Sequence, residues 1–172
     1  VDVATVRNLA KYKKLCHHMH LSIQSGSDTV LKRMNRRYDY ADYLEIVRAM
    51  KEADANYAIT TDIIVGFPGE TDEEFQESLK AVNEVGFSGV HVFRYSKRRG
   101  TKAADMKEQI DGNKKNERSA KLISAASDAA SRFNKRNTGS VRRVLFERFD
   151  EEAGMLEGHS DNYIKVYCRP DV

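Results

Sequence analysis

The sequence predicts an α/β fold of parallel strands and crossover helices, followed by a small β module. Short β-branched runs alternate with amphipathic, helix-like segments up to residue 138. Beyond that point, only short strand-like runs separated by turn residues follow. We therefore expect a first domain at residues 1–138 and a second module at residues 139–172.

The early helices are predicted from capping residues and apolar spacing. Residues 2–13 are predicted to be the end of a helix. A short helix capped by Ser27 or Asp28 is expected to run to Met34. A longer helix is predicted over residues 39–53, because it opens with an aspartate and has a second aspartate three residues later. One face of this helix is apolar at helical spacing: Tyr43, Ile46, Val47 and Met50.

Three strands are predicted in the first domain, over residues 18–24, 57–65 and 89–95. Thr71 and Glu74 form a capping box that opens a helix between the second and third strands. Alternation of strands and helices favours parallel strands joined by helical crossovers. Three strands are too few for a complete barrel, so they suit part of one.

The rest of the chain contains a loop, a long helix and short strands. Residues 96–113 are predicted as a basic loop, and residues 114–135 as a helix. The apolar stripe of that helix is Leu122, Ala126, Ala129 and Phe133. Strands are then predicted at residues 141–149, 155–158 and 163–167, with the acidic run at 150–152 as a hairpin turn.

Charge is distributed unevenly along the chain, although the net charge is only +3. Residues 1–93 have a net charge of −3 and residues 149–172 of −4, whereas residues 94–148 have a net charge of +10. The middle segment is therefore a candidate surface for a polyanion, most simply nucleic acid. The alternative is an ordinary solvated helix rich in lysine.

The cysteine content argues against a disulfide scaffold or a zinc finger. Cys16 and Cys168 are the only two cysteines, and their separation fits neither. A reducing, cytoplasmic location is expected, and no segment is apolar enough to suggest a membrane span. We expect Cys16, which directly precedes the first strand, to be a small buried side chain.

Three loops follow the carboxyl ends of the predicted strands. They contain Gln24–Ser27, Gly66–Glu70 and Arg94–Ser96. Ligands bind at this edge in parallel α/β folds, so the three loops together predict a binding site. Taken singly, each loop also fits a plain strand-to-helix turn.

These loops carry a resemblance to a known family. The segments are HLSIQSGSDTVLKRMNRRY, TTDIIVGFPGETDEEF and FRYSKRRGTKAADM. They resemble the radical-SAM domain of the MiaB-like methylthiotransferases, nearest the MtaB branch. The resemblance implies a C-terminal fragment containing the last part of a partial (β/α) radical-SAM barrel, a connecting helix and an incomplete β module of the TRAM type.

The resemblance also implies an activity. Members of that branch add a methylthio group to C2 of N6-threonylcarbamoyladenosine beside the tRNA anticodon. The alternatives are a sister branch, acting on isopentenyl-adenosine in tRNA or on an aspartate of a ribosomal protein, and a truncated paralogue that binds SAM or RNA without catalysis.

The implied cofactors are S-adenosyl-L-methionine (SAM) and two [4Fe–4S] clusters. The chain lacks the CxxxCxxC triplet that holds the radical cluster, so we expect the isolated chain to be inactive and assign it no catalytic residue. Arg36 is a candidate partner for the SAM carboxylate, with an ordinary surface arginine as the alternative. The residues expected to contact SAM are Gln24, Ser25, Arg36, Ile64, Val65, Gly66, Phe93 and Tyr95.

The implied partner is tRNA, gripped mainly through its phosphates. The residues expected to contact RNA are Arg98, Arg99, Arg142, Arg143 and Arg148, with a merely solubilising role as the alternative. A barrel that lacks its first strands exposes a sheet edge, so dimerisation or strand swapping through that edge is expected.

Three histidines near the first strand invite a metal interpretation. His18 and His20 are two residues apart, so they point to one face of a strand, and His17 precedes them. No acidic or cysteine partner is close in sequence, and two histidines make a poor site without a third ligand. We therefore expect structural roles for these histidines and no metal site.

Overall fold

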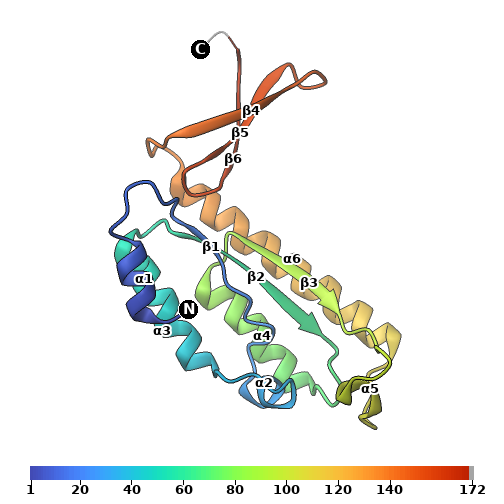
Figure 1. Ribbon diagram of the computed structural model, residues 1–172. Coiled ribbons are helices and arrows are strands. Elements are labelled where there is room, and N and C mark those ends of the chain that lie inside the picture. Colours follow the sequence, from blue (N-terminus) through green and yellow to red (C-terminus); the bar gives the residue numbers. More distant parts are fainter. Residues whose placement is uncertain (171–172) are drawn as a thin grey trace.

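The computed structural model describes residues 1–170 and contains two three-stranded sheets connected by one long helix (Figure 1). The first sheet is parallel, in the order β1-β2-β3, and the second is antiparallel, in the order β4-β5-β6. The strands of the first sheet are β1 (His18–His20), β2 (Ala58–Val65) and β3 (Gly89–Arg94). Those of the second are β4 (Val144–Asp150), β5 (Met155–Ser160) and β6 (Lys165–Cys168).

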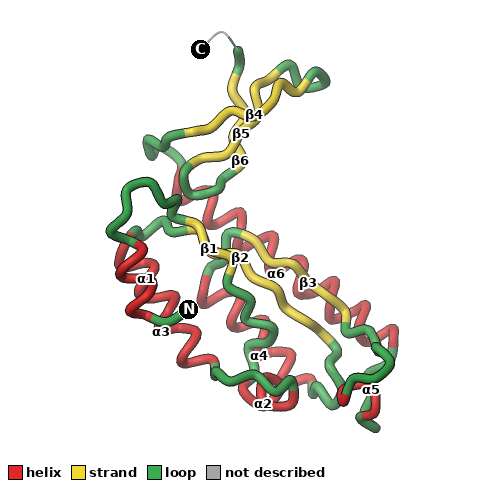
Figure 2. Tube along the Cα trace, in the orientation of Figure 1, coloured by secondary structure: helices red, strands yellow, loops and turns green. Residues whose placement is uncertain are grey.

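Helices alternate with the strands of the first sheet, as expected. They are α1 (Val3–Leu9), α2 (Asp28–Arg33), α3 (Tyr40–Ala53), α4 (Asp72–Val85), α5 (Lys102–Asp105) and α6 (Gly112–Asn137). No helix within residues 1–170 is long and apolar enough to cross a membrane. Figure 2 shows the helices on one side of the parallel sheet and the loops that follow the strands at one end.

The helix starts follow the predicted caps. Asp39 and Asp42 form a reciprocal capping box at α3, and Thr71 and Glu74 form another at α4. Each box satisfies backbone N–H groups that have no partner within the helix. Helix α4 ends at Gly86, whose left-handed backbone (φ 66°) suits glycine. Both capping predictions are confirmed.

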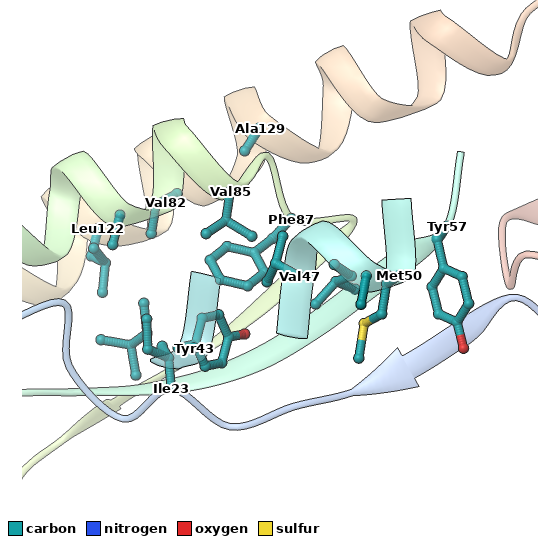
Figure 3. Close-up of a cluster of buried hydrophobic side chains, with 14 of the residues drawn as sticks. Ile23, Tyr43, Val47, Met50, Tyr57, Val82, Val85, Phe87, Leu122 and Ala129 are labelled. Atoms are coloured by element: carbon teal, nitrogen blue, oxygen red, sulfur yellow. The ribbon is translucent and has the colours of Figure 1, made fainter. Parts of the chain in front are cut away.

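The hydrophobic core lies between one face of the parallel sheet and the helices α3, α4 and α6. Side chains of strand β2 alternate between the two faces of the sheet. Ile59, Ile63 and Val65 on the helix side are at most 2% exposed, while Asp62 on the other side is partly accessible. Figure 3 shows Phe87, which is 0% exposed, at the centre of this cluster. Burying such a side chain stabilises the fold by roughly 2–3 kcal/mol.

Three local expectations need correction. Only His18–His20 of the predicted first strand forms a continuous ladder, and the chain rejoins the sheet by a single bridge at Gln24. The predicted loop at 96–113 contains α5, and α6 begins at Gly112 because the Asp111 side chain caps it. Cys16 is exposed and not buried, because it lies in the irregular segment before β1.

The β module contacts the first domain through the turn between β5 and β6. Asn162 is fully buried there and donates to the Asn56 carbonyl (3.1 Å) and to Asn137 Oδ1 (3.0 Å). The Tyr163 ring stacks on His18 at a centroid distance of 4.4 Å. The sheet order leaves β1 and β3 as edge strands, so dimerisation through an edge stays a prediction.

Candidate functional site

A pocket of about 530 Å³ lies at the carboxyl ends of the three parallel strands. That volume is within the range of small-molecule sites, and this edge of a parallel sheet is where ligands bind. Its walls come from the ends of β1, β2 and β3 and from the segment that includes α5. The lining residues are Gln24, Asp62, Ile64, Phe93, Arg94, Tyr95, Ser96, Arg98, Thr101 and Ala103.

Gln24 is held in the pocket wall by an unusual backbone. Its φ of 69° lies in the left-handed region, which costs a residue with a side chain about 1 kcal/mol. Two hydrogen bonds to β2 fix it there: the Gln24 N–H donates to the Asp62 carbonyl and the Ile64 N–H donates to the Gln24 carbonyl, both at 2.9 Å. Strain of this kind is concentrated at binding sites.

Aromatic and aliphatic side chains supply the apolar part of the pocket. The Phe93 side chain is 52% exposed although it is large and hydrophobic, and Ile64 lies beside it on the neighbouring strand. The Tyr95 ring packs edge-on against Phe67, with centroids 5.3 Å apart. The Tyr95 hydroxyl is buried without a hydrogen-bond partner among the described residues, so Tyr95 offers the pocket its ring and not an accessible polar group.

Three of the expected SAM contacts lie behind the pocket wall. Ser25 is 0% exposed and its hydroxyl lies 3.3 Å from that of Ser78. Val65 is also 0% exposed. Gly66 donates its N–H to Glu70 at 2.6 Å, and a Cβ on it would lie 2.2 Å from Lys115 Cγ. The space beside Gly66 is therefore filled by Lys115, and contact of these three residues with SAM stays a prediction.

A buried ion pair fixes the loop after β2. Arg118 of α6 donates to the Glu70 carboxylate at 2.7 Å and to its carbonyl at 3.0 Å, and both side chains are at most 3% exposed. Burial raises the pKa of the Glu70 carboxyl, while the Gly66 amide and the Arg118 guanidinium oppose that rise. Sequence reasoning missed Arg118, although it precedes Leu122 by one turn on the buried stripe of α6.

A second ion pair joins α2 to the start of α4. Arg33 binds the Glu74 carboxylate with both terminal nitrogens. Partial burial would raise the pKa of Glu74, but hydrogen bonds from Arg33, Thr29 and the Thr71 amide lower it to about 2. Glu74 therefore stays charged and fixes the entry to α4, and with it the loop that ends at Glu70.

Arg36 does not join the pocket at the strand ends. It lines a separate hollow beyond α2, together with Asp28, Asp39 and Asp42. Lys32 and Arg37 line the same hollow, which therefore has charges of both signs and lies apart from the pocket at the strand ends. The structure therefore favours the surface alternative for Arg36, and its contact with the SAM carboxylate stays a prediction.

The arginines expected to bind RNA fall into two groups. Arg98 lines the pocket and Arg99 is exposed beside it. Those of the β module face carboxylates: Arg142 lies 3.1 Å from Asp54, Arg143 3.7 Å from Asp161 and Arg148 2.9 Å from Glu157.

Two of the three histidines near β1, His17 and His18, have structural contacts. His17 binds Asp54 at 2.9 Å. His18 lies 3.1 Å from the Thr60 hydroxyl. Burial, followed by the charge of His20, lowers the pKa of His18 and favours its neutral form. His20 differs, because its Nε2 lies 3.2 Å from Asp62 Oδ2 on the open face of the sheet.

Comparison with known proteins shows the class of protein to which this chain is similar. Residues 1–82 match the radical SAM superfamily. The solved structure of coproporphyrinogen III oxidase (HemN) from Escherichia coli, a radical SAM enzyme, superposes with a TM-score of 0.62 over 75% of this chain and 30% of that chain, at 18% identity. This second likeness concerns the fold alone. The chain is thus a radical SAM protein by sequence and shares the fold of one.

The particular family follows from curated relatives. Over 96% of its length the chain is 45% identical to the threonylcarbamoyladenosine tRNA methylthiotransferase MtaB of Thermotoga maritima. Over 91% it is 42% identical to the tRNA-2-methylthio-N(6)-dimethylallyladenosine synthase of Caldicellulosiruptor saccharolyticus. The chain belongs to the MiaB-like methylthiotransferase family. It spans only 38% and 34% of the length of these two relatives.

The residues of this chain do not fit an iron–sulfur cluster. It has two cysteines, of which Cys16 lies exposed in the loop before β1 and Cys168 lies on β6 in the other module. A [4Fe–4S] cluster is usually held by several thiolates gathered at one place. No chemical step is therefore assigned to a cluster bound by these residues.

Proposed function

We propose that this chain contributes the SAM-binding strand ends of a radical-SAM tRNA methylthiotransferase. The observation that carries the proposal is the pocket in which Gln24, Ile64, Phe93 and Tyr95 converge from three separate motifs. The enzyme would add a methylthio group to C2 of N6-threonylcarbamoyladenosine, as the name of the Thermotoga relative indicates. SAM, together with an iron–sulfur cluster held elsewhere, would supply the radical chemistry.

The pocket residues have distinct roles in this proposal. Ile64 and Phe93 offer apolar surface to the flat adenine ring, which aromatic and aliphatic side chains bind well. The Gln24 amide supplies hydrogen bonds that fix its orientation, and the Tyr95 ring, packed on Phe67, completes the wall. The Glu70–Arg118 pair holds the neighbouring loop in place without touching the ligand.

Binding of SAM to the purified chain, measured by NMR titration, tests the pocket. Phe93→Ala removes the exposed apolar wall and is expected to weaken SAM binding about tenfold. This loss of affinity corresponds to about 1.4 kcal/mol of binding free energy. Phe149→Ala is the matched control, because Phe149 is exposed to a similar extent (50% against 52%) but lies in the β module. Equal affinity in the two variants would contradict the proposal.

The isolated chain is expected to be inactive, because it lacks the cluster cysteines. After reconstitution with iron and sulfide, and addition of SAM and reductant, no deoxyadenosine should form. Detection of deoxyadenosine above the level of a protein-free control would show that the chain holds a working cluster after all.

The substrate is the finer part of the proposal. A relative from the dimethylallyladenosine branch is also 45% identical, over 149 residues, so identity alone does not separate the branches. Mass spectrometry of tRNA and ribosomal protein from a deletion strain would distinguish them. Loss of the methylthio group from N6-threonylcarbamoyladenosine supports the proposal, whereas its loss from another target assigns the chain to a sister branch.

For tRNA binding, Arg98 and Arg99 are the proposed contacts nearest the site. They lie at or beside the pocket, and the segment 94–148 that contains them has a net charge of +10. Phosphates are bound by such cationic side chains with strong dependence on salt. The paired arginines of the β module, Arg142, Arg143 and Arg148, would have to exchange carboxylates for phosphates.

A further inference from the structure

The face of the parallel sheet that points away from the helices is polar. Parallel sheets usually bury apolar residues on both faces. Here, Ser22, Thr60 and Asp62 are only partly buried on the open face, and His20 and His91 are exposed there. Such a face fits the wall of a cavity or barrel interior better than an interface with another helix layer.

Three of these side chains converge. His20, Asp62 and His91 each place one potential ligand atom within 4.8 Å of the other two. Asp62 and His91 are register partners on β2 and β3, and His20 comes from β1. The arrangement rests on three hydrogen-bonded strands and not on mobile loops, which is the support that a preorganised site needs.

We propose that His20, Asp62 and His91 bind one divalent transition-metal ion of the zinc class. Two imidazole nitrogens and one carboxylate oxygen are a familiar ligand set for such ions, whereas Mg²⁺ and Ca²⁺ prefer oxygen alone. Ligand atoms of a tetrahedral zinc site, each about 2 Å from the ion, lie about 3.3 Å apart. The 3.2 Å between His20 Nε2 and Asp62 Oδ2 matches that separation.

The groups around the ligands hold them in the orientation that metal binding needs. His20 Nδ1 lies 3.1 Å from the Thr60 hydroxyl, which turns Nε2 toward Asp62. Nε2 also lies 3.1 Å from the Ser22 hydroxyl, a contact that a bound ion would replace. The Thr60 hydroxyl lies 3.1 Å from Nε2 of His18 and can donate a hydrogen bond to that nitrogen. Ser22 donates to Asp62 Oδ2 at 2.9 Å. Such outer hydrogen bonds commonly fix metal ligands.

The proposed site has three protein ligands and leaves a fourth position for water or another ligand. Asp62 also lines the pocket at the strand ends, so the metal would lie next to that pocket. This site could not be predicted from the cluster of histidines at 17, 18 and 20, because the partners of His20 come from two other strands. The proposal does not rest on SAM binding, which can be measured in the absence of metal.

The test is titration of the metal-free chain with Co²⁺, followed by competition with Zn²⁺. We expect one equivalent to give the visible bands of tetrahedral cobalt and to be displaced by zinc. Asp62→Asn and His91→Gln should each weaken binding by at least about tenfold, since even changes next to metal ligands have effects of that size. His91 is exposed, so its variant is expected to fold.

His159→Gln provides the matched control. His159 binds Glu147 at 3.0 Å, which reproduces a histidine–carboxylate pair without belonging to the cluster of three. Its replacement should leave cobalt binding unchanged. A Cys16→Ser/Cys168→Ser background excludes binding by thiolates. The proposal is overturned if no cobalt spectrum appears, or if both cluster variants bind as the parent does.

Discussion

The two sheets of this protein are stabilised in opposite ways. The parallel sheet has one face covered by helices, and Ile63, Val65 and Phe87 of the core beneath it are 0% exposed. In the antiparallel sheet, Leu145 is 70% exposed and Phe149 is 50% exposed. The first sheet therefore contains a hydrophobic core of its own, and the second does not.

The contacts that hold the second sheet to the first domain are few and mostly polar. Asn162 binds Asn56 and Asn137, and Arg142 binds Asp54 across the same boundary. Hydrogen bonds of this kind contribute about 1 kcal/mol each, against roughly 2–3 kcal/mol for one buried aromatic side chain. The fold therefore depends on the first sheet, while the position of the β module depends on a few directional contacts.

The loss of stability should be largest for a variant in the buried core. Phe87→Ala leaves a cavity in the core and is expected to lower the free energy of unfolding by about 3–5 kcal/mol. Phe149→Ala, on the exposed face of β4, should cost less than about 1 kcal/mol. Urea denaturation of both variants measures the difference. Similar losses in the two would mean that the exposed face of the β module is covered in solution.

The loss of stability should be next largest for a variant that breaks the buried pair of Arg118 and Glu70. Arg118→Ala leaves the Glu70 carboxylate buried without its partner and is expected to cost about 3 kcal/mol in urea denaturation. The control is Lys121→Ala on the same helix, where the pair with Glu117 is more than half exposed and should contribute less than about 0.5 kcal/mol.

A double variant separates loss of the charge pair from loss of packing. Glu70→Gln with Arg118→Met leaves no charge buried, while the glutamine still accepts the Gly66 N–H. It should therefore lose less stability than Arg118→Ala, because unpaired buried charge is the costly feature. A double variant as unstable as the single one would assign the effect to packing alone.

Local signals predicted the capped helix starts and the buried stripe of the long helix well. The Asp39 and Thr71 caps rest on hydrogen bonds within four residues, so the sequence alone determines them. The buried stripe of α6 follows from helical periodicity in the same way. The pocket was predictable because strand order places three loops at one edge, and Gln24, Ile64, Phe93 and Tyr95 meet there.

Contacts between distant segments could not be predicted from such signals. Gly66 was expected to leave room for a ligand, but a helix that begins more than 40 residues later places Lys115 there. Arg142 was expected to contact RNA, and the structure pairs it with Asp54, 88 residues earlier in the chain, so its contact with RNA stays a prediction. These partners depend on how whole elements pack, which periodicity and capping do not determine.

The loss of stability should be smallest for a variant at the polar boundary between the two sheets. Partial burial would raise the pKa of Asp54, but His17, the Asn56 amide and Arg142 lower it to about 2. Because the folded pKa is below the usual value of about 3.9, the carboxylate contributes stability above roughly pH 4 and loses it as the pH falls toward 2. Asp54→Asn should therefore cost about 1–2 kcal/mol at pH 7.

That cost is expected to shrink toward zero as the pH falls to 2, since the wild-type carboxyl then becomes increasingly neutral, as asparagine is at every pH. The measurement is the difference in urea midpoint between wild type and Asp54→Asn from pH 7 to pH 2. Glu52→Gln is the control, because Glu52 also pairs with an arginine but is 62% exposed, so its effect should stay below about 0.5 kcal/mol throughout. A difference for Asp54→Asn that persists unchanged at pH 2 would mean that hydrogen bonding, and not charge, holds the β module to the first domain.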